Sequence, residues 1–254
     1  MIHTRIIPCL LLKGQRLVKT VNFTNPKYIG DPINAVKIFN DKEVHELVFL
    51  DITASTEKRT PRLDYISDIA SECFMPLGYG GGIRTVKQAE DIFNRGVEKV
   101  IINTGAVENP SFIRELADLF GSQSVVVSID VKKNFLGNYQ TYTYSGKTKT
   151  QWDPVTWAKE AERLGAGEII LNSIDRDGSM KGYDIPLIKS VSASVSIPVV
   201  ACGGAGTVED FGKAIHEGGA SAAAAGSLFV YYGKHRAVLI NFPNDEELKS
   251  NKLH

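Results

Sequence analysis

Short apolar runs recur along the chain and are separated by amphipathic stretches of about a dozen residues. The runs are mostly continuous rather than alternating in polarity, which is typical of strands buried on both faces of a parallel sheet. Such a succession of strand and helix is typical of α/β proteins. The predicted strands cover residues 5–10, 46–51, 75–80, 99–103, 125–130, 168–173, 197–202 and 220–226. In a chain of 254 residues they predict one α/β domain, a (βα)8 TIM barrel spanning residues 1–254.

Three helix starts and two insertions refine this pattern. Capping residues precede proline at Asp31-Pro32, Asn109-Pro110 and Asp153-Pro154, and each pair predicts a helix with proline at its first position. Longer segments, 13–30 and 131–151, follow the first and fifth strands, and the stretch NYQTYTYSGK within the second alternates enough to predict a small hairpin. Both follow a strand, so a barrel places them on its C-terminal face, where active sites of this fold lie.

The chain repeats itself at an offset of 122 residues. GGIRTV (81–86) aligns with GGAGTV (203–208), and Glu46 aligns with Glu168. At the first strand of each half the offset becomes 119, which places Leu11 opposite Asp130. The repeat predicts half-barrels of about residues 1–122 and 123–230, a divergent tail over 231–254, and two matching sites.

Each half contains a glycine pair at the end of one strand and small or polar residues at the end of the next. The first set is Gly81, Gly82, Asn103 and Thr104, and the second is Gly203, Gly204, Gly226 and Ser227. Glycine lets backbone N–H groups approach an anion, and the helix that follows adds its positive dipole end. A tight turn alone explains a single glycine pair, whereas two sets at symmetric positions predict a small ligand with a phosphate at each end.

Composition narrows the classes of partner. Lys+Arg and Asp+Glu are equal at 29 each, which lacks the basic excess of a nucleic-acid-binding protein. The three cysteines form no C-x-x-C pair, and the histidines show no metal-ligand spacing, so we expect a reduced cytoplasmic protein with no metal and no cofactor. The apolar run over residues 6–12 is too short for a signal peptide or a membrane span, and we interpret it as a buried strand.

Over residues 4 to 229 the chain resembles the cyclase subunit of imidazole glycerol phosphate synthase (HisF). The segments that carry the resemblance include RIIPCL, VKTVNF, ELVFLDITAS, GGGIR, KVIIN, FGSQSVVVSID, SIDRDG and GGAG. The resemblance implies a (βα)8 barrel that works beside a glutaminase subunit. Ammonia released by the glutaminase passes through the barrel to the C-terminal face and reacts there with a substrate that carries two phosphates.

The resemblance also implies that two aspartates, at the ends of the first and fifth strands, perform the acid/base chemistry. Asp130 matches the second, but Leu11 stands in the place of the first. Leucine exchanges no proton, and loss of a positioned acid or base typically lowers a rate by about 10² to 10⁴. Lys19, Asp51 and Asp177 keep the family pattern, and we expect them to bind the substrate.

Charged residues stand at the starts of four predicted strands: Arg5, Glu46, Lys99 and Glu168. Strand starts converge on the lower opening of a barrel, so these side chains are predicted to form a ring of alternating salt bridges. They match the family's ammonia gate at all four positions. The match favours a glutaminase partner docked at the N-terminal face.

Further departures from the family are Thr20, Asn172, Cys202 and the tail from Phe229 onward, which resembles the WbuZ-like group associated with amidation of bacterial surface sugars. The first hypothesis is therefore an ammonia-transferring synthase subunit that serves an amino sugar in lipopolysaccharide synthesis, with a sugar amidotransferase as a further partner. The second is a genuine cyclase subunit in histidine biosynthesis that uses Asp130, with Asp51 as the candidate for a second group. The third is a non-catalytic scaffold that activates a glutaminase.

Overall fold

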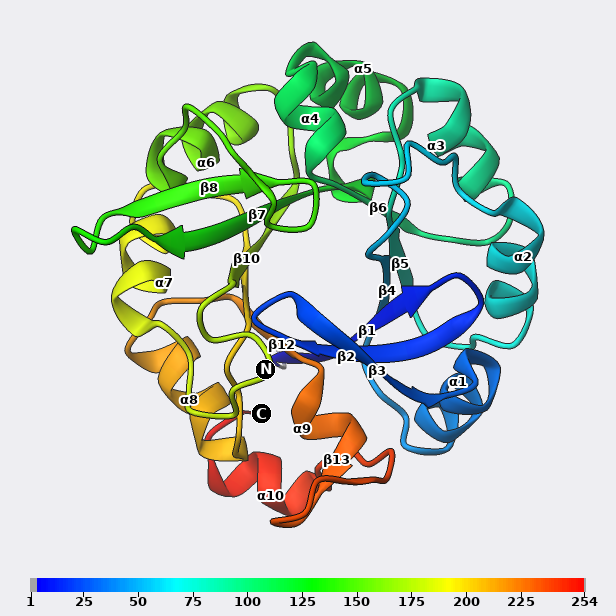
Figure 1. The fold of residues 1–254 in the computed structure, drawn as a ribbon, viewed down its shortest axis with the longest axis vertical. Helices are drawn as coiled ribbons and strands as arrows, with labels where there is room; N and C mark the ends of the chain where they lie inside the picture. The colour runs from blue at the N-terminus through cyan, green and yellow to red at the C-terminus, as the bar shows by residue number, and fades with distance from the viewer. Residues whose placement is uncertain (1–3, 254) are drawn as a thin grey trace.

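The computed structural model describes residues 4–253, which form a closed barrel of parallel strands with helices around it (Figure 1). The barrel strands are β1 (Arg5–Lys13), β4 (Leu47–Asp51), β5 (Leu77–Gly80), β6 (Lys99–Ile102), β7 (Val125–Lys133), β10 (Glu168–Ser173), β11 (Val199–Cys202) and β12 (Ala222–Ala225). Each strand is hydrogen-bonded to the next, and pairing of β10 with β7 closes the circle. The predicted (βα)8 TIM barrel is confirmed.

The helices of the outer layer follow the strands in chain order. They are α1 (Pro32–Asp41), α2 (Leu63–Ser71), α3 (Val86–Phe93), α4 (Thr104–Glu108), α5 (Ser111–Phe120), α6 (Pro154–Arg163), α7 (Ile185–Ser192), α8 (Val208–His216) and α9 (Ser227–Val230). A single turn of 3-10 helix (Ser122–Ser124) links α5 to β7. No helix within residues 4–253 has both the length and the apolar character needed to cross a membrane.

Apolar side chains fill both faces of the strands. One cluster, which includes Ile7, Val126 and Val200, lies inside the barrel, and a larger one, which includes Phe39 and Trp157, lies between the strands and the helices. Burial on both faces explains why the strands appear in the sequence as continuous apolar runs.

Helix starts follow local sequence chemistry. Asp31 and Asp153 cap α1 and α6 with their carboxylates, and proline occupies the first turn of each helix, as predicted. The prediction at Asn109-Pro110 is displaced by one residue, because Pro110 is the capping position and α5 begins at Ser111. Asn109 instead accepts a hydrogen bond from the Ser111 hydroxyl at 2.8 Å.

The internal repeat has a structural counterpart at two helix starts. Thr85 and Thr207, which are 122 residues apart, each form a capping box at the start of α3 and α8. Each of these helices follows a glycine pair, Gly81-Gly82 or Gly203-Gly204. The same local solution therefore recurs at the two positions that the sequence repeat aligns.

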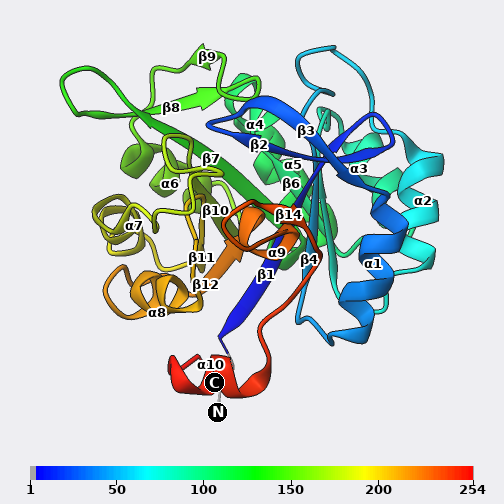
Figure 2. The same ribbon diagram turned by 60° about the horizontal axis from the view of Figure 1, so that its bottom comes forward.

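The insertions form hairpins on the C-terminal face (Figure 2). Strands β2 (Arg16–Val21) and β3 (Thr24–Gly30) pair antiparallel, which sequence analysis did not predict. The predicted hairpin in 131–151 is confirmed: β8 (Tyr139–Thr143) pairs with both β7 and β9 (Thr148–Lys149). The tail contains β13 (Tyr231–Tyr232), β14 (Ala237–Val238) and α10 (Asp245–Ser250).

Candidate functional site

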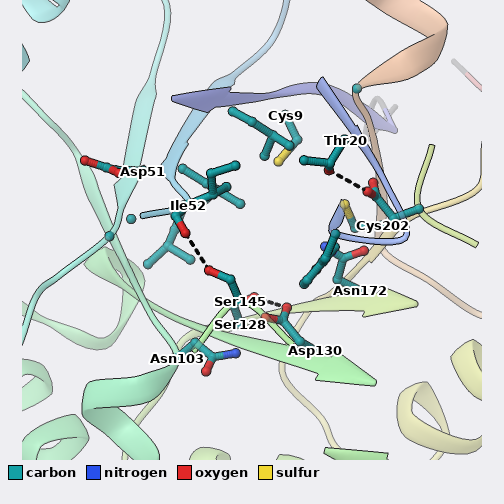
Figure 3. Close-up of a pocket in the computed structure, with 18 of the residues that line it drawn as sticks. Cys9, Thr20, Asp51, Ile52, Asn103, Ser128, Asp130, Ser145, Asn172 and Cys202 are labelled. Carbon is teal, nitrogen blue, oxygen red and sulfur yellow. Dashed lines mark hydrogen bonds between the residues drawn. The ribbon is translucent and has the colours of Figure 1, made fainter. Parts of the chain in front are cut away.

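A cavity of about 300 Å³ lies at the C-terminal ends of the barrel strands. Its walls come from most of the barrel strands and from both inserted hairpins, so residues distant in sequence surround one space (Figure 3). The lining includes Leu11, Asp130 and every residue predicted to bind the ligand: Lys19, Asp51, Gly81, Gly82, Asn103, Thr104, Asp177, Gly203, Gly204, Gly226 and Ser227. The structure therefore brings these residues together, while their contacts with a ligand stay a prediction.

The first cup, which we define as Gly81, Gly82, Asn103 and Thr104, joins the end of β5 to the start of α4. Gly82 has a φ of +74°, and a Cβ atom there would lie 2.5 Å from the Arg59 carbonyl oxygen. Asn103 has a buried Oδ1 atom with no hydrogen-bond partner in the described chain. An unpaired buried acceptor on the cavity wall is suited to a ligand that offers a hydrogen-bond donor.

The second cup, Gly203, Gly204, Gly226 and Ser227, occupies the matching position in the other half. Gly204 has a φ of +126°, and a Cβ atom there would lie 2.2 Å from the Gly182 carbonyl oxygen, so only glycine fits. Ser227 is buried, and its hydroxyl has no hydrogen-bond partner within residues 4–253. Phosphate sites in this fold are frequently formed by the loops after the seventh and eighth strands, which here are β11 and β12.

Asp130 lies on the cavity wall near the end of β7 (Figure 3). The pKa of its carboxyl is raised from 3.8 to about 7: burial is the largest cause and the negative charge of Asp177 adds to it, while a hydrogen bond from Ser128 at 3.2 Å opposes the shift. A carboxyl with a pKa near neutrality serves both as proton donor and as acceptor. Asp130 is therefore suited to acid/base chemistry.

Leu11 occupies the corresponding end of β1, where it pairs with Leu50 of β4 and Val18 of β2. Its side chain is half-buried and lines the same cavity as Asp130. The register leaves no ambiguity about which β1 residue faces the cavity here, because Leu12 pairs with Leu17 and is buried in the outer cluster. A leucine thus lies where the family resemblance implies an aspartate.

Asp51 lines the cavity, but its carboxylate has other partners. Its Oδ2 atom accepts a hydrogen bond from Arg59 at 2.9 Å, and Oδ1 accepts from the backbone N–H groups of Thr53 and Ala54. Figure 3 shows the Asp51 side chain directed away from the centre of the cavity. The Asp51 carboxylate therefore holds the turn after β4. Because it points away from the centre of the cavity, it does not face the space in which the substrate is predicted to bind.

Lys19 and Asp177, both predicted ligand-binding residues, are paired with each other. The Lys19 ammonium donates to Asp177 Oδ1 at 2.9 Å, and both side chains are almost fully buried at the edge of the cavity. Of the carboxylates that line the cavity, only Asp130 has no cationic partner within residues 4–253.

At the opposite end of the barrel, Arg5, Glu46, Lys99 and Glu168 form a closed set of ion pairs, which we call the charge ring. Arg5 contacts Glu46 at 2.6 Å and also Glu168, and Lys99 contacts both glutamates at 2.9 Å. The arginine and lysine charges lower the pKa of Glu168 against the opposing effect of burial. Positive and negative charges alternate around the opening, as the strand starts predicted, while the function of the ring as a gate stays a prediction.

A small space of about 10 Å³ lies inside the barrel between the charge ring and the cavity. Glu46 and Glu168 border it below, apolar side chains such as Val126 and Val200 surround it, and Cys9 borders both this space and the cavity above. The volume is about that of a single water-sized probe. Its apolar walls favour a small neutral molecule over an ion.

Sequence analysis missed two contributors to the site. Arg59 holds Asp51, and Ser145 reaches across the mouth from the loop between β8 and β9, donating to the Ile52 carbonyl oxygen at 2.6 Å. Arg59 carries no local signal of this role, because its partner is defined only once β4 and its loop are folded. The SGK turn that contains Ser145 was recognised only as part of a hairpin. Residues 4–253 contain no cluster of three or more side chains able to hold a metal ion.

Comparison with known proteins agrees with this geometry. A family model described as "Histidine biosynthesis protein" matches residues 5–236. The imidazole glycerol phosphate synthase subunit HisF of Alkaliphilus metalliredigens is 50% identical over 231 residues, 91% of this chain and 92% of that protein. The chain belongs to the HisF family.

Other HisF relatives extend the match over nearly the whole chain. The hisF2 protein of Pseudomonas aeruginosa is 53% identical over 248 residues, 98% of this chain and 99% of that protein. The imidazole glycerol phosphate synthase subunit HisF of Pyrococcus furiosus is 48% identical over 236 residues, 92% of each chain. The match to hisF2 of Pseudomonas aeruginosa thus includes most of the tail that follows the barrel.

Proposed function

We propose that this chain is the synthase subunit of a glutamine amidotransferase complex in which the ancestral ring closure is weakened. It binds a ligand by two phosphates at the first and second cups and receives ammonia from a glutaminase docked at the N-terminal face. Leu11 carries the proposal, because it places an apolar side chain on the cavity wall where the family resemblance implies a proton-transferring aspartate.

The interior of the barrel supports ammonia transfer. The charge ring borders the lower end of the apolar space, and Cys9 lies between that space and the cavity that contains Asp130. A neutral ammonia molecule fits walls of this character better than ammonium does, because transferring a charge into an apolar environment is strongly unfavourable. The charge ring and the apolar space are kept, although the aspartate expected at position 11 is absent. This combination favours a protein that delivers ammonia to a different acceptor over one that has lost its function.

For the acceptor we propose an amino sugar in lipopolysaccharide synthesis, with a sugar amidotransferase as a third component. The support is the resemblance of the tail to the surface-sugar group, together with Thr20, Asn172 and Cys202, which line the cavity and differ from the family pattern. In a mixture of this chain, its glutaminase, the amidotransferase and a nucleoside triphosphate that activates the amide oxygen, ammonia from glutamine should replace that oxygen, which leaves as phosphate, and convert an acetamido sugar to an acetamidino sugar. Mass spectrometry would show exchange of one oxygen for NH, and an unchanged sugar would contradict the acceptor.

A genuine histidine-pathway cyclase is the second candidate, and Asp130 favours it, because a carboxyl with a pKa of about 7 is able both to donate and to accept a proton. Growth tests separate the two. Expression in a bacterial strain that lacks its own HisF should not restore growth without histidine, whereas expression of the Alkaliphilus relative should. Growth equal to that control would establish the cyclase.

Removing Lys99 tests the charge ring. Lys99→Met leaves Glu46 and Glu168 buried with Arg5 as their remaining cation, and breaking a buried ion pair in this way typically destabilises a protein by about 3–5 kcal/mol. Urea unfolding should show this loss, while Lys87→Met, which removes an exposed lysine on α3, should leave stability nearly unchanged.

The same variant separates a gate from a purely structural ring. With the glutaminase present, Lys99→Met should lower transfer from glutamine more than transfer from added ammonia. Equal losses from both nitrogen sources would contradict the conduit.

A further inference from the structure

Strand β2 is fastened to the loop after β10 at one point beside the cavity. Lys19 Nζ donates to Asp177 Oδ1 at 2.9 Å and to the Thr20 carbonyl oxygen at 2.9 Å, and Thr20 Oγ1 donates to Asp177 Oδ2 at 3.0 Å. The backbone N–H of Asn22 donates to the Asp177 carbonyl oxygen at 2.9 Å. We call Lys19, Thr20 and Asp177 the clamp, because they attach β2 to the loop after β10 in addition to its pairing with β1.

The clamp borders the second cup directly. A Cβ atom on Gly226 would lie 3.0 Å from Lys19 Cε, closer than an ordinary van der Waals contact, so the lysine stem packs directly against this glycine of the cup. Lys19, Asp177 and Ser227 all line the cavity, and the buried Ser227 hydroxyl has no hydrogen-bond partner in the described chain. Figure 3 shows the Thr20 hydrogen bond at the edge of the cavity near Cys202. The ammonium of Lys19 therefore lies beside a cup that contains an unpaired hydroxyl.

The clamp already satisfies this ammonium. Lysine has three hydrogens to donate, and they face the Thr20 carbonyl oxygen and the two oxygens of Asp177, the second at 3.2 Å. The Asp177 carboxylate also cancels the positive charge. A phosphate entering the second cup thus meets a neutral pair and must take Lys19 from Asp177 to gain a full charge-assisted hydrogen bond.

We propose that Asp177 is an internal competitor for the anion site: its carboxylate occupies Lys19 until a phosphate of the ligand displaces it, and Thr20 sets how firmly it is held. The inference rests on the proposed function only in assigning a phosphate to the second cup. Displacing Asp177 from Lys19 breaks the side-chain hydrogen bonds between these two residues, so ligand binding removes one attachment of β2 to the loop after β10, while the pairing of β2 with β1 remains.

Thr20 adds a hydroxyl that donates a further side-chain hydrogen bond to the Asp177 carboxylate. A hydroxyl that donates to a buried carboxylate stabilises its charged form where it lies. Asp51 is a contrast within the same cavity, because Arg59 holds its carboxylate away from the centre of the cavity and no cavity-lining lysine pairs with it within residues 4–253. Competition of this kind is therefore expected at the second cup and not at the first, in spite of the symmetric backbone.

The test is a titration of the full-length protein with inorganic phosphate, followed by amide NMR shifts at constant ionic strength. Amides of Gly204, Gly226 and Ser227 report the second cup, and those of Gly82 and Thr104 report the first cup in the same sample. Asp177→Asn keeps the shape and an acceptor for Lys19 but removes the competing charge. It should tighten phosphate binding at the second cup by about tenfold and leave the first cup unchanged.

Thr20 provides the matched pair of variants. Thr20→Val keeps the branched shape without the hydroxyl and should also tighten binding at the second cup, by less than Asp177→Asn. Thr20→Ser keeps the hydroxyl and should bind as the original protein does. Thermal unfolding of each variant shows that it is folded, and phosphate should raise the melting temperature most in Asp177→Asn, where Lys19 otherwise remains buried without a counter-ion.

The possible outcomes separate the clamp from the proposed function. Unchanged or weaker phosphate binding at the second cup in both Asp177→Asn and Thr20→Val overturns the clamp, even while both cups bind phosphate. An absence of binding at both cups in every variant overturns the clamp and the two-phosphate ligand together. Tightening at both cups alike would show a general charge effect and would also refute the competition.

Discussion

Replacing Leu11 by aspartate is expected to raise ammonia-dependent ring closure by about 10² to 10⁴, the range that a positioned acid or base group typically contributes. The reason is that Leu11 lines the same cavity as Asp130, at the end of β1, and the aspartate would supply a second proton-transferring group. Turnover of the family substrate with added ammonium salt measures the change without any glutaminase.

Leu11→Asn is the matched control, since it has the shape and polarity of the aspartate but exchanges no proton. If Leu11→Asp were no faster than Leu11→Asn, the pocket would have diverged at more positions than this one. Thr20, Asn172 and Cys202, which line the same cavity, would then be the next positions to restore.

Replacing Asp130 by asparagine is expected to abolish the gain from Leu11→Asp, with a loss of about 10² to 10⁴. The two groups act as a unit, so the double variant should be about as slow as Asp130→Asn alone. In the Leu11→Asp single variant, which still has Asp130, the rate should depend on pH with an inflection near 7, because the pKa of buried Asp130 is raised to about 7.

The same replacement is expected to change stability in the opposite direction. The folded-state pKa of Asp130 lies above the ordinary value of 3.8, so its contribution to stability is fully present below pH 3.8 and is lost as the pH rises through about 7. Asp130→Asn carries no such loss, and its stability advantage should grow across this range and level off above it. Urea unfolding over a pH series measures the advantage, and a variant less stable at neutral pH would show that the carboxylate is better solvated than its burial implies.

The barrel strands were predictable because their signal is local. Residues on both faces of a barrel strand are buried, so each strand is a continuous apolar run, and the 254-residue length limits the number of such units. The glycine sets were equally visible, since a φ of +74° at Gly82 or +126° at Gly204 requires glycine whatever surrounds it.

Features that depend on distant residues were less predictable. Strand β2 pairs with its chain neighbours β1 and β3, but the side-chain contact that buries Lys19 was not predictable, because Asp177 lies 158 residues from Lys19. For the same reason Lys19 and Asp177 were assigned to the ligand as separate residues, whereas the structure pairs them. The direction of the Asp51 side chain was also unpredictable, because Arg59 determines it only after the loop has folded.

The central claim is that ring closure is impaired by the absence of one acid/base group while the ligand cups and the charge ring remain. The most direct measurement is the rate at which the purified chain closes the imidazole ring when supplied with the family substrate and ammonium salt, beside HisF of Alkaliphilus metalliredigens under the same conditions. We predict a rate lower by about 10² or more. A rate equal to that of the relative would contradict the account and establish the chain as a histidine-pathway cyclase.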